Sequence, residues 1–227
     1  MPKDKMQPRK TRATFRPRTL RVRALVWLSG SILLAAAGST RAALAEATPC
    51  RDPHRPAPAA CTLAVTGNIT ARDALVLSGI LHRMDSPKTL LLVRFDSGGG
   101  DAHAAMKIGR ALRAASAHGY VPPRGRCFSA CVLALAGASS RAIHGRVGIH
   151  RPEPVDALTL SRAEALRRTE EGAREIRGYL AEMGIGKRLY DAMIEVPPRD
   201  MRILTQAELR AFGLLREEDR GGRAASP

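Results

Sequence analysis

The chain has 227 residues, of which 44% are hydrophobic and only 4% aromatic. This composition suits one domain with a core of Ala, Leu, Val and Ile, and no segment alternates strongly enough for an all-β barrel. The formal net charge is +16, but the first 45 residues carry ten Lys or Arg against one acid, which leaves the remainder at +7. Because no basic cluster is interleaved with aromatic residues, we expect no nucleic-acid partner.

The first 47 residues have the pattern of a targeting segment. Residues 1–23 hold nine Lys or Arg, residues 24–38 are apolar, and small residues follow at 43–47. A signal peptide has this order, and the apolar stretch is short for a membrane span. The alternative is an uncleaved inner-membrane anchor with its basic end inside. Either interpretation places the rest of the chain outside the cytoplasm, in the periplasm or secreted.

The predicted elements follow in chain order. After a proline-rich segment at 48–61, strands are expected at 62–67, 89–95, 119–122 and twice within 141–150, and helices from Thr70 to Arg83, at 102–118, from Ser129 to Ala136, at 161–183, at 187–195 and from Thr205 to Gly213. Capping boxes mark three of the helix starts. The alternation predicts an α/β fold with a mainly parallel sheet and a C-terminal helical extension. The domain is expected to span 62–216, with a polar tail at 217–227.

Four cysteines, Cys50, Cys61, Cys127 and Cys131, all follow the targeting segment. An even number of cysteines in an oxidising compartment indicates disulfides. The sequence does not fix the pairing, and the local pairs Cys50–Cys61 and Cys127–Cys131 are the simplest hypothesis. Zinc is the alternative, but the spacing lacks a second close cysteine pair or a nearby H-x3-H, so no metal is expected.

The stretch D-S-G-G-G-D at 96–101 joins an apolar strand to a helix. Successive glycines let the backbone turn sharply and point N–H groups outward, which at a helix N-terminus makes an anion or oxyanion receptor. A phosphate loop is excluded, because no G-K-[ST] follows and the G-x-G-x-x-G spacing is missing. The alternative is a tight turn that needs small residues.

Ser129 and His150 are the candidate catalytic pair. Ser129 lies between a predicted strand and a helix, where a serine exposes its hydroxyl and leaves the next N–H, of Ala130, as an oxyanion donor. A plain helix N-cap is the alternative. His150 ends a strand, from which it can meet a serine of a neighbouring strand as general base, although a lone histidine is more often structural. His144, in a turn, and His103, facing away from the apolar stripe of its helix, are weaker candidates.

The order of these motifs resembles the Clp protease proteolytic-subunit family, within the Clp/crotonase fold, and above all its secreted periplasmic relatives. The similar segments are FDSGGGDAHAAMKIGRAL, CFSACVLALAGA, RVGIHRP and ILTQAELRAFGLL, which spread over about residues 62–216. The resemblance implies stacked β-α-β units and a serine peptidase that needs no cofactor.

The resemblance also implies a role for each matching residue. Ser129 matches the nucleophile, His150 the general base, and Gly99 and Ala130 the oxyanion-hole donors. The long helix at 161–183 matches the region of subunit contacts, so a homo-oligomer is expected.

The acidic member of the triad departs from the family's pattern. The family's acid immediately precedes the segment that reads R-I-L-T here, and this position is Met201, with Asp200 one place earlier. Asp200 is the predicted orienting acid, Asp191 and Glu195 are alternatives, and a Ser–His dyad is a further one. Loss of the orienting acid lowers the rate by orders of magnitude in well-studied triads.

We therefore expect an extracytoplasmic serine hydrolase, a peptidase with peptide or protein substrates, in which Cys127 and Cys131 brace the turn of Ser129. A Cys127–His150 dyad is the chemical alternative, disfavoured because a thiolate is hard to keep in an oxidising compartment. A non-catalytic envelope protein of the same fold, a scaffold or binding module, is the functional alternative. An acyl-CoA enzyme and an ATPase partner are both disfavoured, because neither CoA nor ATP is supplied outside the cytoplasm.

Overall fold

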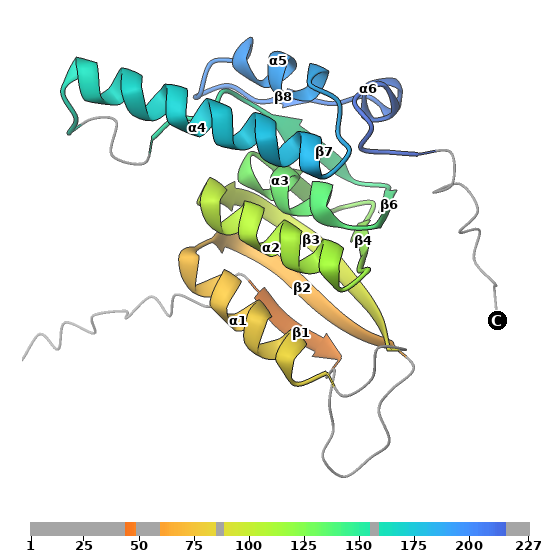
Figure 1. Ribbon diagram of the computed structural model, residues 1–227. Helices are drawn as coiled ribbons and strands as arrows, with labels where there is room; N and C mark the ends of the chain where they lie inside the picture. Colours follow the sequence, from red (N-terminus) through yellow and green to blue (C-terminus); the bar gives the residue numbers. More distant parts are fainter. Residues whose placement is uncertain (1–43, 49–59, 85–88, 155–158, 217–227) are drawn as a thin grey trace, which may run out of the picture. The chain divides into compact units, whose positions relative to one another are not determined.

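Strands and helices alternate along the first two thirds of the described chain, and helices dominate its last third (Figure 1). The computed structural model describes residues 44–48, 60–84, 89–154 and 159–216. Within them the strands are β1 (Leu44–Thr48), β2 (Ala60–Ile69), β3 (Leu90–Gly100), β4 (His118–Val121), β5 (Arg126–Phe128), β6 (Ser140–Ile143), β7 (Arg146–Ile149) and β8 (Arg202–Ile203). The helices are α1 (Ala71–His82), α2 (Ala102–Ala114), α3 (Ala130–Gly137), α4 (Arg162–Glu182), α5 (Arg188–Ile194) and α6 (Gln206–Ala211).

Several predicted features lie outside the described residues. They are the targeting segment up to residue 43, most of the proline-rich segment with Cys50, and the polar tail. Among the described helices, none is both long and apolar enough to cross a membrane.

The sheet is mainly parallel, which confirms the predicted fold class. Its main path runs β1-β2-β3-β5-β7-β8, and β4 branches from β3 and pairs with β6. The inner pairs β2–β3, β3–β5 and β5–β7 are parallel, whereas β1 and β8 are antiparallel to their neighbours. Neither of these two outer strands was expected from the sequence. β1 overlaps the small residues at 43–47, where the sequence predicts cleavage of a signal peptide. Short segments acquire a strand conformation here by pairing with a neighbour.

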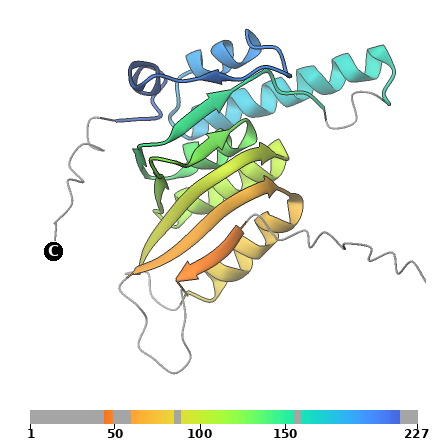
Figure 2. The ribbon, with the colours of Figure 1, turned by 180° about the vertical axis from the view of Figure 1, so that it is seen from behind.

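The helices α1, α2 and α3 cover one face of the sheet, and the opposite face is open (Figures 1 and 2). The apolar run of β3 predicted a strand buried on both faces. In the structure, Leu91, Val93 and Phe95 are buried, whereas Leu90 and Leu92 are 42% and 37% exposed. Only one half of this strand therefore contributes to the core, because no described helix covers the other half.

Two glycines let α2 and α3 approach closely. A methyl group at Gly137 would lie 2.3 Å from the Cα of Gly109, so neither position has room for a side chain. The Tyr179 hydroxyl of α4 reaches across Gly109 and donates a hydrogen bond to the Leu133 carbonyl at 2.7 Å. Burial raises the pKa of this hydroxyl. The C-terminal half of α4 is thus fixed against the layer that carries α3.

The helix starts follow the predicted capping signals. The Thr70 N–H donates to the Asp73 carboxylate at 2.7 Å, and Thr205 forms a capping box with Glu208. The Ser161 hydroxyl accepts the Glu164 N–H at 3.3 Å. These local bonds satisfy N–H groups that have no partner inside the helix, which explains why short sequence patterns predicted them.

Candidate active site

Ser129 lies on a strained turn between β5 and α3. Its backbone has φ 55° and ψ −127°, a region that a residue with a Cβ rarely adopts and that costs about 1–3 kcal/mol. The Ser129 N–H donates to the Gly148 carbonyl at 2.9 Å, and its own carbonyl accepts the Val132 N–H at 3.0 Å. Ser129 occupies the N-cap position of α3, but its side chain makes no capping hydrogen bond. The plain N-cap interpretation therefore does not account for this serine.

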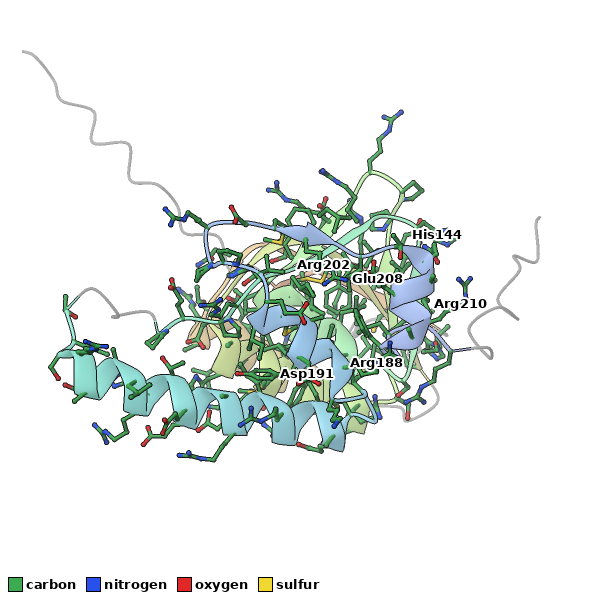
Figure 3. The ribbon with its side chains drawn as sticks, turned by 90° about the horizontal axis from the view of Figure 1, so that it is seen from above. His144, Arg188, Asp191, Arg202, Glu208 and Arg210 are labelled. Atoms are coloured by element: carbon green, nitrogen blue, oxygen red, sulfur yellow. A yellow bond between two sulfur atoms is a disulfide. The ribbon has the colours of Figure 1, made fainter. Side chains whose placement is uncertain are left out.

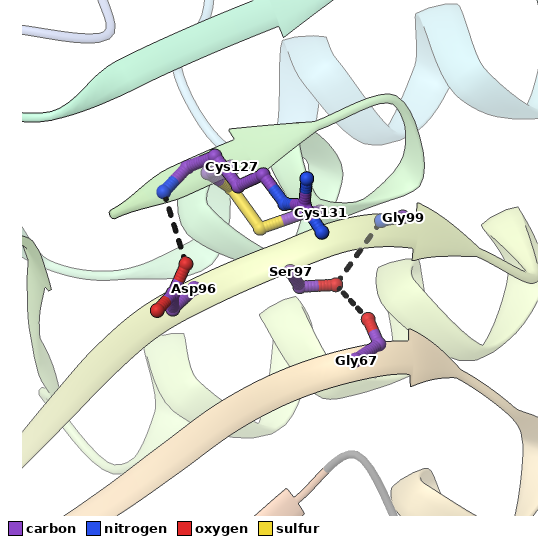
Figure 4. The surroundings of a disulfide bond; sticks show 7 residues. Gly67, Asp96, Ser97, Gly99, Cys127 and Cys131 are labelled. Carbon is purple, nitrogen blue, oxygen red and sulfur yellow. Dashed lines mark hydrogen bonds between the residues drawn. A yellow bond between two sulfur atoms is a disulfide. The ribbon is translucent and has the colours of Figure 1, made fainter. Parts of the chain in front are cut away.

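A disulfide joins Cys127 and Cys131, on either side of Ser129 (Figure 4). This confirms the predicted local pair. Both cysteines are fully buried. Cys61 is disulfide-bonded as well, and its predicted partner Cys50 lies outside the described residues. The described cysteines thus offer no thiolate for a zinc site or a Cys–His dyad, and the described chain holds no cluster of three or more His, Cys, Asp or Glu that could bind a metal.

His150 directly follows β7, the parallel neighbour of β5. In the register of these two strands Phe128 lies opposite Gly148, so Ser129 and His150 leave adjacent strand ends. Adjacent strands are about 4.8 Å apart, which puts the two side chains at the same edge of the sheet. Both residues line one cavity. Among the described residues the Ser129 hydroxyl has no hydrogen-bond partner, and a catalytic bond that tightens only with substrate is common in unliganded sites.

Among the residues that the structure describes, a main-chain carbonyl and not a carboxylate contacts the His150 ring. The Nδ1 atom of His150 lies 2.9 Å from the Arg151 carbonyl oxygen. Since a carbonyl can only accept, this contact requires a proton on Nδ1, and in the neutral imidazole Nε2 is then the nitrogen with a free lone pair. Arg151 is itself fixed, because its N–H donates to the Val196 carbonyl and its Nε to the Ile194 carbonyl, each at 2.9 Å.

The cavity beside Ser129 and His150 has a volume of about 740 Å³, the size of a small-molecule or side-chain site. Its walls come from α2, the start of α3, the segment after β7, and α4 and α5. The larger apolar lining residues include Met106, Leu133, Ile176 and Met193, and the charged or titratable ones include Asp101, His103, Glu153, Arg168, Glu171 and Glu175. The mixture of an apolar lining with charged groups suits a peptide segment.

The two predicted oxyanion donors differ in availability. Ala130 lines the cavity and is the first residue of α3, so its N–H has no partner within the helix. The Gly99 N–H instead donates to the Ser97 hydroxyl at 3.1 Å, and this hydroxyl donates to the Gly67 carbonyl at 2.6 Å (Figure 4). Gly99 does not line the cavity, whereas Gly100 does. For Gly99 to serve as a donor, its N–H must leave Ser97.

The glycine-rich stretch ends a strand instead of forming a separate turn. β3 continues through Gly100, and α2 begins two residues later with Asp101 as its cap. Gly99 has φ 110°, and a methyl group there would lie 2.8 Å from both the Phe128 carbonyl and the Ser129 Cβ. The strand end thus packs directly against the Ser129 turn, which is why only glycine fits.

None of the three predicted acids lines the cavity. Asp200 is exposed, and its N–H donates to the Pro197 carbonyl at 2.9 Å in a tight turn. Asp191 is exposed on α5, and the Glu195 carboxylate lies 3.6 Å from the Arg202 guanidinium. The structure therefore does not bring a predicted acid to His150.

Arg202 also pairs with Glu208, and Figure 3 shows these two side chains beside each other, apart from Asp191. Hydrogen bonds to the Glu208 carboxylate, first from the Thr205 N–H and then from Arg202, lower its pKa to about 2. Arg202 is thus held between two carboxylates and ties the strand after the Asp200 loop to α6.

The structure reveals charged cavity residues that the sequence reasoning did not consider. Glu153 lies three residues after His150 and lines the same cavity. His103 pairs with Glu175 at 2.6 Å across α2 and α4, although it faces away from the core as predicted. His144 makes an edge-on ring contact with Tyr120 and does not line the cavity. The spacing in I-H-R-P-E could have drawn attention to Glu153, but no sequence signal links His103 to Glu175.

Comparisons with known proteins identify the fold. Neither a family model nor a curated protein matches the sequence. Among solved structures, a mutant of the membrane-bound stomatin-specific protease 1510-N is 18% identical, with a TM-score of 0.51 over 67% of this chain and 75% of that chain. ClpP1 from Listeria monocytogenes is 18% identical, with a TM-score of 0.50 over 68% of this chain and 88% of that chain. The chain therefore has the fold of Clp-type proteases, as the sequence resemblance predicted.

Proposed function

We propose that the protein is an extracytoplasmic serine hydrolase, a peptidase that uses a Ser129–His150 dyad. One observation carries the proposal: the strained Ser129 turn and the Nδ1-protonated His150 leave adjacent parallel strands and line one cavity. A fold that peptidases use supports this assignment. At this level of identity the fold alone does not carry activity, so the proposal rests on the site.

The chemistry follows from the two side chains. The Ser129 hydroxyl attacks the carbonyl carbon of a peptide bond while Nε2 of His150 takes its proton. The Ala130 N–H stabilises the oxyanion, and the Gly99 N–H joins it once released from Ser97. The imidazolium then protonates the leaving amine. Water hydrolyses the acyl-enzyme with the same base, and the Arg151 carbonyl keeps Nδ1–H in place throughout.

The disulfide of Cys127 with Cys131 supports a location outside the cytoplasm, since such bonds persist in oxidising compartments. We place the protein in the periplasm or the secreted fraction, after signal-peptide cleavage or anchored to the inner membrane through its N-terminal segment. Homo-oligomerisation and independence from an ATPase stay predictions from the sequence.

A non-catalytic binding protein of the same fold is the second candidate. Two observations favour it: no carboxylate contacts His150 among the described residues, and the Gly99 N–H is already bonded to Ser97. Such a protein would keep the cavity as a binding site without turning over a substrate.

A fluorophosphonate probe on the purified, oxidised full chain separates the two candidates. We expect labelling at Ser129, its complete loss in Ser129→Ala, and a rate about 10²–10⁴-fold lower in His150→Ala, the range for loss of a general base. His144→Ala is the matched control, because this exposed histidine does not line the cavity, and it should label like the wild type. Absence of labelling in the folded wild type would reject the hydrolase and favour the binding protein.

A further inference from the structure

We infer that the Cys127–Cys131 disulfide is a positioning element that holds Ser129 in its reactive conformation, so that the site works fully only in the oxidised chain. This inference rests on the proposed function, because it concerns the same nucleophile. It assigns the bond a role in catalysis beyond general stability.

The first step concerns the backbone of Ser129. A residue with a side chain keeps a φ of 55° only where the surrounding structure over-determines it. The hydrogen bonds from Ser129 N–H to Gly148 and from Val132 N–H to Ser129 fix the two sides of the residue. The first bond joins the turn to β7, and the second closes the first turn of α3, so neither of them links β5 directly to α3.

The second step concerns how β5 and α3 are joined. β5 has three residues and meets β3 at a single pair, Ser97 with Cys127. The ladder between β3 and β5 is therefore short, and it offers few backbone hydrogen bonds that would keep the Ser129 turn from relaxing. The disulfide links this strand directly to the first turn of α3, with a Cα–Cα distance of 5.2 Å across a sequence separation of 4. Ser129 is the central residue of the closed loop, so the bond limits its backbone from both sides.

The third step distinguishes the effect of the disulfide on the position of Ser129 from its effect on the stability of the fold. All eight residues of α3 are buried, and the core around them consists of apolar side chains from several elements. Removing one short-range cross-link leaves that packing in place. We therefore expect a folded chain in which the Ser129 turn relaxes and the hydroxyl leaves its place in the cavity that His150 also lines.

A dithiol reductant opens the bond by thiol–disulfide exchange. The dithiol is oxidised to its cyclic disulfide, and Cys127 and Cys131 each gain one electron and one proton to become thiols. Because both cysteines are fully buried, the folded chain exchanges slowly, so the state formed during folding persists. A chain that folds without the bond stays poorly active until it is oxidised.

The test compares wild type with Cys127→Ala/Cys131→Ala. The matched control is Cys50→Ala/Cys61→Ala, which removes the other predicted pair. Cys61 lies opposite Leu91 on β3, eight residues from the Gly99 that adjoins Ser129, or about 26 Å at about 3.3 Å per residue. Alanine is chosen because both sites at the turn are buried and apolar.

We expect the first-order labelling constant for a fluorophosphonate probe to fall about tenfold or more in the Cys127/Cys131 variant, a size that relaxation of one strained residue can explain. The half-saturating probe concentration should stay unchanged, because the cavity walls remain. Amide hydrogen exchange at Ser129 should become faster in this variant and not in the control. A purely structural disulfide would instead lower the unfolding temperature and leave both readouts of the folded state unchanged.

Equal labelling constants and equal Ser129 exchange in variant and wild type would overturn the inference. If the wild type itself does not label, the proposed function fails, and the exchange rate at Ser129 alone decides the role of the bond. If the double variant does not fold, the Cys50→Ala/Cys61→Ala variant takes its place, compared before and after prolonged incubation with dithiothreitol, because the buried bond exchanges slowly; mass spectrometry verifies that both thiols have formed.

Discussion

The turn that carries Ser129 and the loop that carries Asp200 are built in opposite ways. The serine turn is fixed by a buried disulfide and by main-chain bonds to a neighbouring strand. The Asp200 loop is exposed along most of residues 195–201 and contains two consecutive prolines. Its main contribution to the site is the Val196 carbonyl, which accepts the N–H of Arg151. The loop therefore supports His150 through the backbone, whereas the Asp200 carboxylate makes no hydrogen bond or ion pair with a described residue.

This difference teaches that the two residues of the proposed pair are positioned by different means. Ser129 is held by covalent and steric constraints, so changes in its turn should have large effects. The histidine is held by a carbonyl that the loop keeps in place, so changes in the loop should act only through Arg151. Three substitutions, from the largest expected effect to the smallest, test this contrast.

The largest effect is expected for Gly99→Ala. The new methyl group would lie 2.8 Å from Ser129 Cβ, at a backbone φ of 110°, so we expect a loss of about 2–4 kcal/mol from strain and overpacking together. Thermal or urea unfolding measures the loss, and fluorophosphonate labelling should become very slow. Gly98→Ala is the matched control one residue away, because its methyl group would meet nothing within 4 Å. Similar losses in both variants would contradict the close packing of Gly99 against the serine turn.

An intermediate effect is expected for Arg151→Ala. The substitution removes the hydrogen bond from Nε to the Ile194 carbonyl but keeps the backbone bond to Val196. The carbonyl that holds His150 becomes less well fixed, so labelling of Ser129 should slow by about tenfold or less, since a typical hydrogen bond contributes about 0.5–1.5 kcal/mol. The rate is to be measured across pH, because a base held less firmly should lose rate at every pH. Arg199→Ala, an exposed arginine in the same loop, should have no effect, and an equal loss there would refute the role of Arg151.

The smallest effect is expected for Asp200→Asn. Because this exposed carboxylate does not line the cavity, the labelling rate should stay within a few-fold of the wild type. An orienting acid of a catalytic triad would instead lower the rate about 10⁴-fold when changed to the amide. A loss of that size would show that the loop rearranges on binding and that Asp200 is the third member of a triad. Glu153→Gln is the companion variant, and it tests the role of an orienting acid for Glu153, which lines the same cavity as His150.

Much of the fold could be predicted because its signals are local. Most of the alternation of strands and helices up to residue 150 appears as expected, although β5, directly before Ser129, was not predicted as a strand of its own. The caps at Thr70, Ser161 and Thr205 and the buried stripe of Ala105, Ile108 and Leu112 also appear as expected. Each depends on residues within one or two helical turns. The position of Ser129 before a helix is likewise a local signal, and so is the pairing of Cys127 with a cysteine four residues away.

The remaining features depend on which strands become neighbours. Residue 150 follows 129 by twenty-one positions, and only the pairing of β5 with β7, with β6 placed beside β4 instead, brings the two together. The one-sided covering of β3 and the exposure of Asp200 likewise result from packing between distant segments. Even the Gly99 N–H, which the motif predicted to face the oxyanion, is directed by a hydroxyl two residues earlier that is in turn held by Gly67.

The sequence by itself thus determined most of the elements, the helix caps and the identity of the serine and histidine as candidates, and it offered the local disulfide as the simplest pairing. Local propensity, hydrophobic periodicity and the closure of short loops depend on interactions between residues near each other in the chain, so a single sequence is enough to predict them. The tertiary structure alone decided that Ser129 and His150 share a cavity, that Nδ1 of His150 contacts a main-chain carbonyl, and that Asp200, Asp191 and Glu195 do not line that cavity. These outcomes depend on strand order and loop path, which are set by burial summed over the whole core and leave no short pattern in the sequence.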